Sequence, residues 1–134
     1  ISFSLLIACI NGTRTVAIQA LGEWVRLFSD STRKDEALEA IALHLPNRST
    51  NTSDAAALGG ILPYLATYAE SWSMSHYEKF LGNGHANTSQ QIVLMTTLKC
   101  FRYSYRVFDF LRPAMLSALQ NDCENYALGI RHSE

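Results

Sequence analysis

Residues 87–120 decide the fold that we expect for this chain, and they read NTSQQIVLMTTLKCFRYSYRVFDFLRPAMLSALQ. Apolar residues recur in this segment at steps of three or four, which is the spacing of one face of an α-helix. The members of this first face are Leu94, Leu98, Phe101, Tyr105, Phe108, Leu111 and Met115. A second apolar stripe lies beside it and contains Cys100, Tyr103, Val107, Phe110 and Ala114. Because a helix that is apolar over most of its circumference is normally buried, we predict a long central helix over about residues 88–112, with its first face largely buried.

Three basic residues share the narrow face that remains, and they are Lys99, Arg102 and Arg106. Lysines and arginines at helical spacing can contact the phosphates of a nucleic acid, and tyrosines beside arginines suit single-stranded bases. Alternatively, the three residues form the solvated edge of the helix or pair with acidic residues of a helix expected over residues 33–45. The sequence leaves both interpretations open.

Helical signals also fill the rest of the chain. Further helices are expected over residues 16–28, 33–45, 76–81 and 120–130, and another begins after a cap at Ser53 or Asp54. Capping boxes are expected at Thr32, Ser75 and Thr88. The expected breaks are a turn at Asn11-Gly12, a polar loop over residues 46–54, and a kink or restart at Pro63. Alternating strand patterns are absent after residue 10, so we predict one all-α domain over residues 1–134, a bundle of five or six helices around the central helix.

The composition predicts that the surface is rich in Ser, Thr and Asn, that a partner covers part of it, or both. Of the 134 residues, 48% are hydrophobic and only 17% are charged, against roughly 25% charged in an ordinary soluble domain. Fewer charges are therefore available to cover the surface. The net charge of −1 gives no long-range attraction to nucleic acid or to an anionic membrane, although a local basic stripe still could.

Motifs for catalysis or for metal binding are missing from the sequence. No pair of histidines has the spacing of a helical metal site, and no serine lies in a nucleophile elbow. No segment reaches the roughly 18 uninterrupted apolar residues of a membrane-spanning helix. We therefore predict a protein that is not an enzyme, holds no cofactor or metal, and does not span a membrane.

Cysteine and asparagine patterns allow two further interpretations. Cys9, Cys100 and Cys123 lack the close spacing of a disulfide framework or a zinc site, and we expect reduced, buried thiols. Glycosylation sequons occur at Asn11, Asn47, Asn51 and Asn87, all in expected loops. Either they carry glycans or the loops are rich in Asn, Ser and Thr because these residues favour turns.

These observations lead to three hypotheses about function. The first is a non-enzymatic helical subunit that packs into a larger homo- or hetero-oligomeric assembly, with aromatic residues as interface anchors. The candidate anchors are Trp24, Trp72, Tyr64 and Tyr68. The second is a nucleic-acid-binding subunit, such as a viral coat or nucleocapsid protein, that uses the basic stripe. The third is a secreted, glycosylated helical effector.

Overall fold

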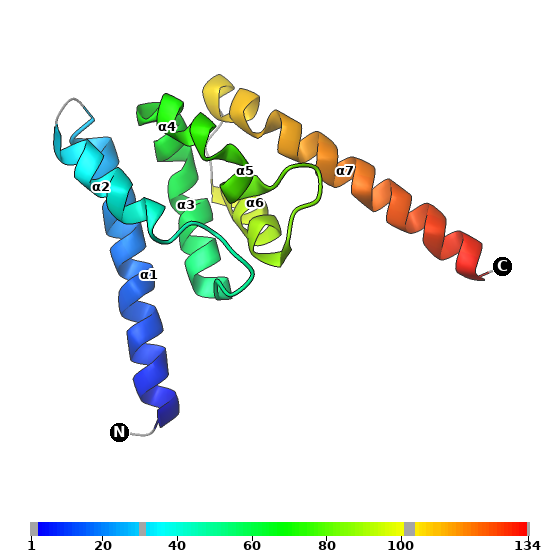
Figure 1. The fold of residues 1–134 in the computed structure, drawn as a ribbon, viewed down its shortest axis with the longest axis horizontal. Helices are drawn as coiled ribbons and strands as arrows, with labels where there is room; N and C mark the ends of the chain where they lie inside the picture. Colours follow the sequence, from blue (N-terminus) through cyan, green and yellow to red (C-terminus); the bar gives the residue numbers. More distant parts are fainter. Residues whose placement is uncertain (1–2, 30–31, 101–103, 134) are drawn as a thin grey trace.

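The computed structural model describes residues 3–29, 32–100 and 104–133, and the side chains of residues 12–29, 32–100 and 104–121. In these residues the chain forms seven α-helices and no strand (Figure 1). They are α1 (Phe3–Leu27), α2 (Thr32–Ala42), α3 (Thr52–Tyr68), α4 (Glu70–Ser75), α5 (Tyr77–Leu81), α6 (Thr88–Cys100) and α7 (Tyr105–Ser133). The all-α prediction is confirmed, although the described part holds more helices than the five or six predicted.

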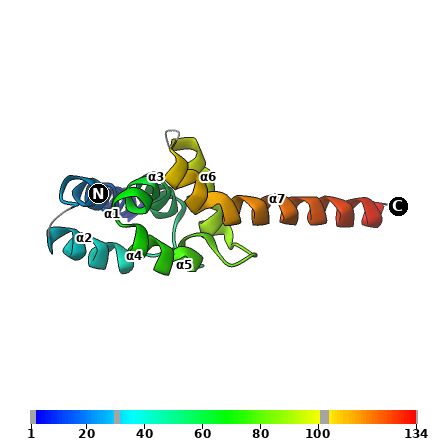
Figure 2. The same cartoon turned by 90° about the horizontal axis from the view of Figure 1, so that it is seen from above.

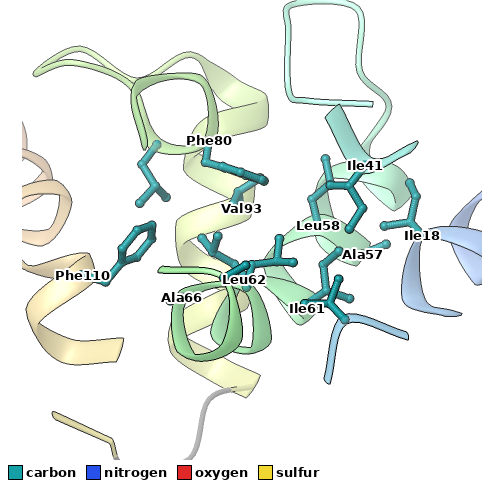
Figure 3. Packing of buried hydrophobic residues seen from close by; sticks show 14 of the residues in the cluster. Ile18, Ile41, Ala57, Leu58, Ile61, Leu62, Ala66, Phe80, Val93 and Phe110 are labelled. Carbon is teal, nitrogen blue, oxygen red and sulfur yellow. The ribbon is translucent and has the colours of Figure 1, made fainter. Parts of the chain in front are cut away.

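The centre of the fold is α3, not the predicted helix over residues 88–112. Helix α3 lies between α1 on one side and α6 on the other, and it packs more extensively against these two helices than against any other. Its residues Leu58, Leu62 and Leu65 are completely buried. Figure 3 shows this core, in which side chains from α1, α2 and α6 meet those of α3. The faces of α3 that meet α1 and α6 are buried, whereas Tyr64 is half-buried and Tyr68 is exposed.

Two glycines allow these helices to pack closely. A Cβ atom at Gly22 of α1 would lie 2.3 Å from the Cγ2 atom of Ile61 on α3. A Cβ atom at Gly59 of α3 would lie 2.6 Å from the carbonyl oxygen of Val93 on α6. Distances this short are not sterically possible, so each close approach depends on the absence of a side chain.

Pro63 lies inside α3, which continues to Tyr68 without a restart. Proline has no N–H, so the carbonyl oxygen of Gly59, four residues earlier, loses its helical donor. The hydroxyl group of Thr97 on α6 supplies a donor, at 2.9 Å from the Gly59 oxygen, and it also lies 2.8 Å from the Val93 oxygen. A neighbouring helix thus satisfies the group that proline leaves without a partner.

The predicted central helix is interrupted between its two halves. Helix α6 ends at Cys100 and α7 begins at Tyr105, while Ser104 is not helical and residues 101–103 lie outside the described part. The two halves are therefore separate helices, and the predicted first face does not run along one of them.

The prediction that the first face is largely buried is wrong for most of its described members. Leu111 is buried, but Leu98, Tyr105 and Phe108 are exposed, and Leu94 is half-buried. Phe101 lies outside the described residues. In α7 the second stripe is buried instead, at Val107, Phe110 and Ala114. The break gives α7 its own orientation, which turns this second stripe toward the rest of the fold.

Another predicted break lies inside a helix. Helix α1 runs through Asn11-Gly12, because one internal glycine costs only about 1 kcal/mol relative to alanine. The helix predicted over residues 120–130 is the continuation of α7, which passes through Pro113.

The starts of α3 and α6 are capped by asparagines rather than by the predicted residues. The backbone N–H of Asp54 donates to Asn51 Oδ1 at 2.8 Å at the start of α3, so neither Ser53 nor Asp54 is the cap. At α6, Asn87 and Gln90 form a reciprocal pair in which each backbone N–H donates to the other side chain at 2.9 Å. This is a capping box, one residue earlier than predicted. The hydroxyl of Ser75 donates to the Trp72 carbonyl oxygen instead of capping α5.

The two longest helices extend beyond the body that the other helices form. Figures 1 and 2 both show the C-terminal part of α7 leaving this body, and Figure 1 shows the first turns of α1 doing so. Within the part of the chain that the structure describes, no helix is both long and apolar enough to cross a membrane.

Candidate functional site

The predicted basic stripe is divided between two helices. Lys99 lies in the last turn of α6 and Arg106 in the first turn of α7, and both are exposed. Arg102 lies outside the described residues. Among the described side chains, no ion pair joins Lys99 or Arg106 to an acidic residue of α2. Their contact with phosphate stays a prediction, but its original basis, one shared helical face, no longer holds.

The four aromatic candidates lie on three helices, α1, α3 and α4. The ring of Trp24 packs against Phe28, and its Nε1 donates to the Arg33 carbonyl oxygen at 2.9 Å, which ties α1 to α2. The ring of Trp72 packs against His76 and Phe80. These contacts give both tryptophans a role within the fold.

The two tyrosine candidates lie on α3. The guanidinium group of Arg26 lies 5.7 Å from the ring centre of Tyr64, a cation–π contact between α1 and α3. Tyr68 is exposed at the end of α3. A role of either residue as an interface anchor stays a prediction.

An open groove of about 920 Å³ lies between α5, α6 and α7, beside the loop of residues 82–86. Its apolar lining includes Met74, Leu81, Leu94, Met95, Leu98 and Phe110, and the charged residues at its border are Glu78, Lys99 and Asp109. Flexible methionines of this kind line surfaces that accept more than one apolar shape. The described lining therefore offers mainly apolar contact to a ligand or partner.

Tyr77 holds α7 at the wall of this groove. Its ring lies edge-on to Phe110 with 5.0 Å between the ring centres, and its hydroxyl oxygen accepts the backbone N–H of Ala114 at 3.0 Å. Burial raises the pKa of Tyr77, and the hydrogen bond from Ala114 partly offsets this rise. At the other end, Asn121 donates from Nδ2 to the Gly84 carbonyl oxygen at 2.7 Å. These contacts fix the position at which α7 leaves the body.

The outer stripe of α7, defined here as Tyr105, Phe108, Leu116 and Leu119, is the second candidate surface. The exposed fractions of these residues are 90%, 39%, 57% and 64%. The steps between them are three, eight and three residues, so they lie on one side of the helix, opposite to buried Ala114. Sequence reasoning assigned the first two residues to a buried face and did not single out Leu116 or Leu119. A signal was available, because the same spacing continues in the sequence at Cys123, Tyr126 and Ile130.

The asparagines of the sequons have structural roles in most cases. Asn51 and Asn87 cap helices, as described above, and Asn47 Oδ1 accepts the backbone N–H and the hydroxyl of Ser49. Asn11 lies inside α1, not in the predicted loop. Helix capping and turn formation therefore explain the asparagines at positions 47, 51 and 87 without a glycan.

Metal ligands are not gathered in the part of the chain whose side chains are described, where no three His, Cys, Asp or Glu residues could hold an ion. Cys100 is exposed, which corrects the prediction of a buried thiol, and the side chains of Cys9 and Cys123 lie outside the described set. Comparison with protein-family models, with curated proteins and with solved structures gives no match for this chain.

Proposed function

We propose that this chain is a non-enzymatic helical subunit that packs into a larger assembly through the outer stripe of α7. The observation that carries the proposal is the exposure of four large apolar side chains along one side of a helix that extends away from the body. Single exposed apolar residues are normal in soluble proteins. An aligned series on a projecting helix is different, because a partner helix can cover all its members at once.

The energy of such an interface supports the proposal. Burying a fully exposed leucine side chain contributes about 1.5–3 kcal/mol. Leu116 and Leu119 are 57% and 64% exposed, so together they offer about 2–4 kcal/mol to a partner. Part of that is offset by the entropy lost on association. The low charge content of 17% also fits a chain whose surface is partly covered in its working state.

A photoreactive amino acid at position 116 tests the proposal in cells that express the full chain. Irradiation should link position 116 to one discrete protein, identified by mass spectrometry of the adduct. The matched control carries the same group at Leu27 of α1, which is 63% exposed and should give no discrete product. Equal labelling from both positions, or none from position 116, would contradict the proposal.

Binding of single-stranded nucleic acid is a second candidate. It is favoured by the position of Tyr105, which is 90% exposed and adjacent in sequence to Arg106, since exposed aromatic rings beside arginines stack on bases. The ratio of absorbance at 260 nm to that at 280 nm in native material tests whether nucleic acid is bound.

A further inference from the structure

We infer that Asn83 is a site of spontaneous deamidation, and that this modification breaks the contact by which the loop of residues 82–86 holds α7. Asn83 and Gly84 lie between α5 and α6, in the loop that contacts α7 (Figure 1). Water is the only co-reactant that the modification needs, because the attacking group is the backbone nitrogen of the residue after the asparagine.

Deamidation replaces the side-chain amide of Asn83 with a carboxylate. The nitrogen of Gly84 loses its proton and attacks Asn83 Cγ. The new N–Cγ bond closes a succinimide ring, the Cγ–Nδ2 bond breaks, and ammonia leaves with the proton. Water then opens the ring at either of its two carbonyl groups. Opening at the Cγ carbonyl gives aspartate, whereas opening at the main-chain carbonyl gives isoaspartate, in which the main chain runs through the former side chain.

Both reacting groups are accessible in the fold, since Asn83 and Gly84 are exposed. Among the described residues, neither the Asn83 side chain nor the Gly84 backbone N–H has a hydrogen-bond partner. Gly84 has a φ of 86°, and a Cβ atom at this position would meet nothing within 4 Å. Because glycine has no side chain, its nitrogen is unhindered and the local backbone can rotate toward Asn83 Cγ.

The same dipeptide occurs at Asn11-Gly12, but there it lies inside α1. In a helix the N–H of each residue donates to the carbonyl oxygen four residues earlier. A helical ψ angle also holds the nitrogen of the next residue away from Cγ of the asparagine. The helix must therefore open before Asn11 can react, whereas Asn83 reacts in the folded chain.

The other asparagines with described side chains are held by hydrogen bonds. Asn47, Asn51 and Asn87 each accept a backbone N–H, and Asn121 donates to a carbonyl oxygen. The residues that follow them are Arg48, Thr52, Thr88 and Asp122. These residues carry side chains that hinder the attacking nitrogen, so we expect Asn83 to be the site that reacts fastest.

Deamidation at Asn83 changes the group that α7 contacts. The carbonyl oxygen of Gly84 accepts Nδ2 of Asn121 at 2.7 Å, about two helical turns beyond Ala114, whose N–H donates to Tyr77. Isoaspartate adds a methylene group to the main chain directly before Gly84, and this displaces the Gly84 carbonyl group from Asn121. Asn83 also lines the groove beside α7, which gains a negative charge.

Peptide mapping of the purified full chain by mass spectrometry tests the site. In warm, mildly alkaline buffer Asn83 should deamidate at least about tenfold faster than Asn11, because α1 must open locally before Asn11 reacts. In concentrated urea, where both sites are unfolded, the two rates should be similar. The matched control is Asn83→Gln, because glutamine keeps the amide but closes a ring far more slowly. This variant should stay unmodified at position 83.

Equal rates at Asn83 and Asn11 in the folded chain would overturn the inference. An Asn11 that is as slow in urea as in buffer would also overturn it, because the fold would then not be the cause of the difference.

Hydrogen exchange measured by mass spectrometry tests the effect on α7. Chains deamidated at Asn83 are separated from unmodified chains by ion exchange, since they carry one more negative charge. Their amides around Asn121 should exchange about three to ten times faster than in the unmodified chain. The fresh variant Asn121→Ala, which lacks the donor, should show the same increase, and incubated Asn83→Gln should exchange like the fresh wild type. A deamidated chain that exchanges like the unmodified one would show that the loop does not hold α7, and it would overturn the inference.

Discussion

Helices α3 and α7 are both rich in apolar residues, yet the fold treats them differently. Helix α3 lies between α1 and α6 and buries most of its apolar side chains, with glycine where a neighbour comes closest. Helix α7 buries one side near its start and leaves Leu116 and Leu119 exposed beyond it. Apolar spacing thus identifies a helix face that can pack against another element. Whether the cover comes from the same chain depends on where the neighbouring helices lie.

Truncating one leucine in each helix should give the largest contrast. Leu62→Ala in α3 removes a completely buried side chain and should lower the free energy of unfolding by about 2–5 kcal/mol. Leu119→Ala in α7 changes a residue that is mostly exposed, and in the isolated chain it should cost less than about 0.5 kcal/mol. Urea unfolding at a concentration low enough to keep the chain monomeric measures both. Similar losses of stability for the two variants would mean that α7 is packed within its own chain.

Glycine substitutions test the close approach of α3 to α6. Gly59→Ala places a methyl group against Val93 and Thr96 and should destabilise the fold by about 1–3 kcal/mol. The control is Gly60→Ala, one residue further on, where a Cβ atom has open space. It should stabilise α3 by about 0.5–1 kcal/mol, since alanine favours helix more than glycine does. Thermal melting of both variants measures whether the two changes in stability have opposite signs. An unchanged melting temperature for Gly59→Ala would refute the close approach of α3 to α6.

A double-mutant cycle tests whether Thr97 compensates for Pro63. Thr97→Val leaves the Gly59 carbonyl oxygen without a donor and should cost about 1–3 kcal/mol. Pro63→Ala restores the helical N–H for that oxygen, so Thr97→Val should cost measurably less when Pro63→Ala is already present. Equal costs in both backgrounds, from urea unfolding curves, would show that the two residues act independently.

The smallest effect on stability is expected for substitutions of the basic residues near the junction of α6 and α7. Replacing Lys99, Arg102 and Arg106 with glutamine should change the free energy of unfolding by no more than about 1 kcal/mol, because the described members are exposed. If these side chains neutralise phosphates, the replacement should also flatten the slope of log K against log salt for single-stranded nucleic acid, by roughly 0.7 for each phosphate no longer neutralised. A wild type that shows no binding at low salt would exclude the phosphate role.

The sequence alone determined that helices form, because the signals for helices are local. Periodic apolar residues, asparagines at helix starts and the absence of strand patterns act within a few residues of each other. The same signals placed the caps at Asn51 and Asn87 only to within a few residues, since several polar residues compete at each start.

The tertiary structure decided which apolar residues are buried. Segment 87–120 carries two apolar stripes, and the break after Cys100 lets α7 bury Val107 and Phe110 while Tyr105 and Phe108 face outward. This choice depends on the position of α5 and on the Tyr77 contacts, which lie far away in the sequence. Pro63 likewise lies inside a helix, and Thr97 of another helix donates to the carbonyl oxygen that proline leaves without its helical donor. The local sequence contains no information about a hydrogen-bond donor on another helix. This is the physical reason why the sequence predicted the helices but not which of their residues are buried.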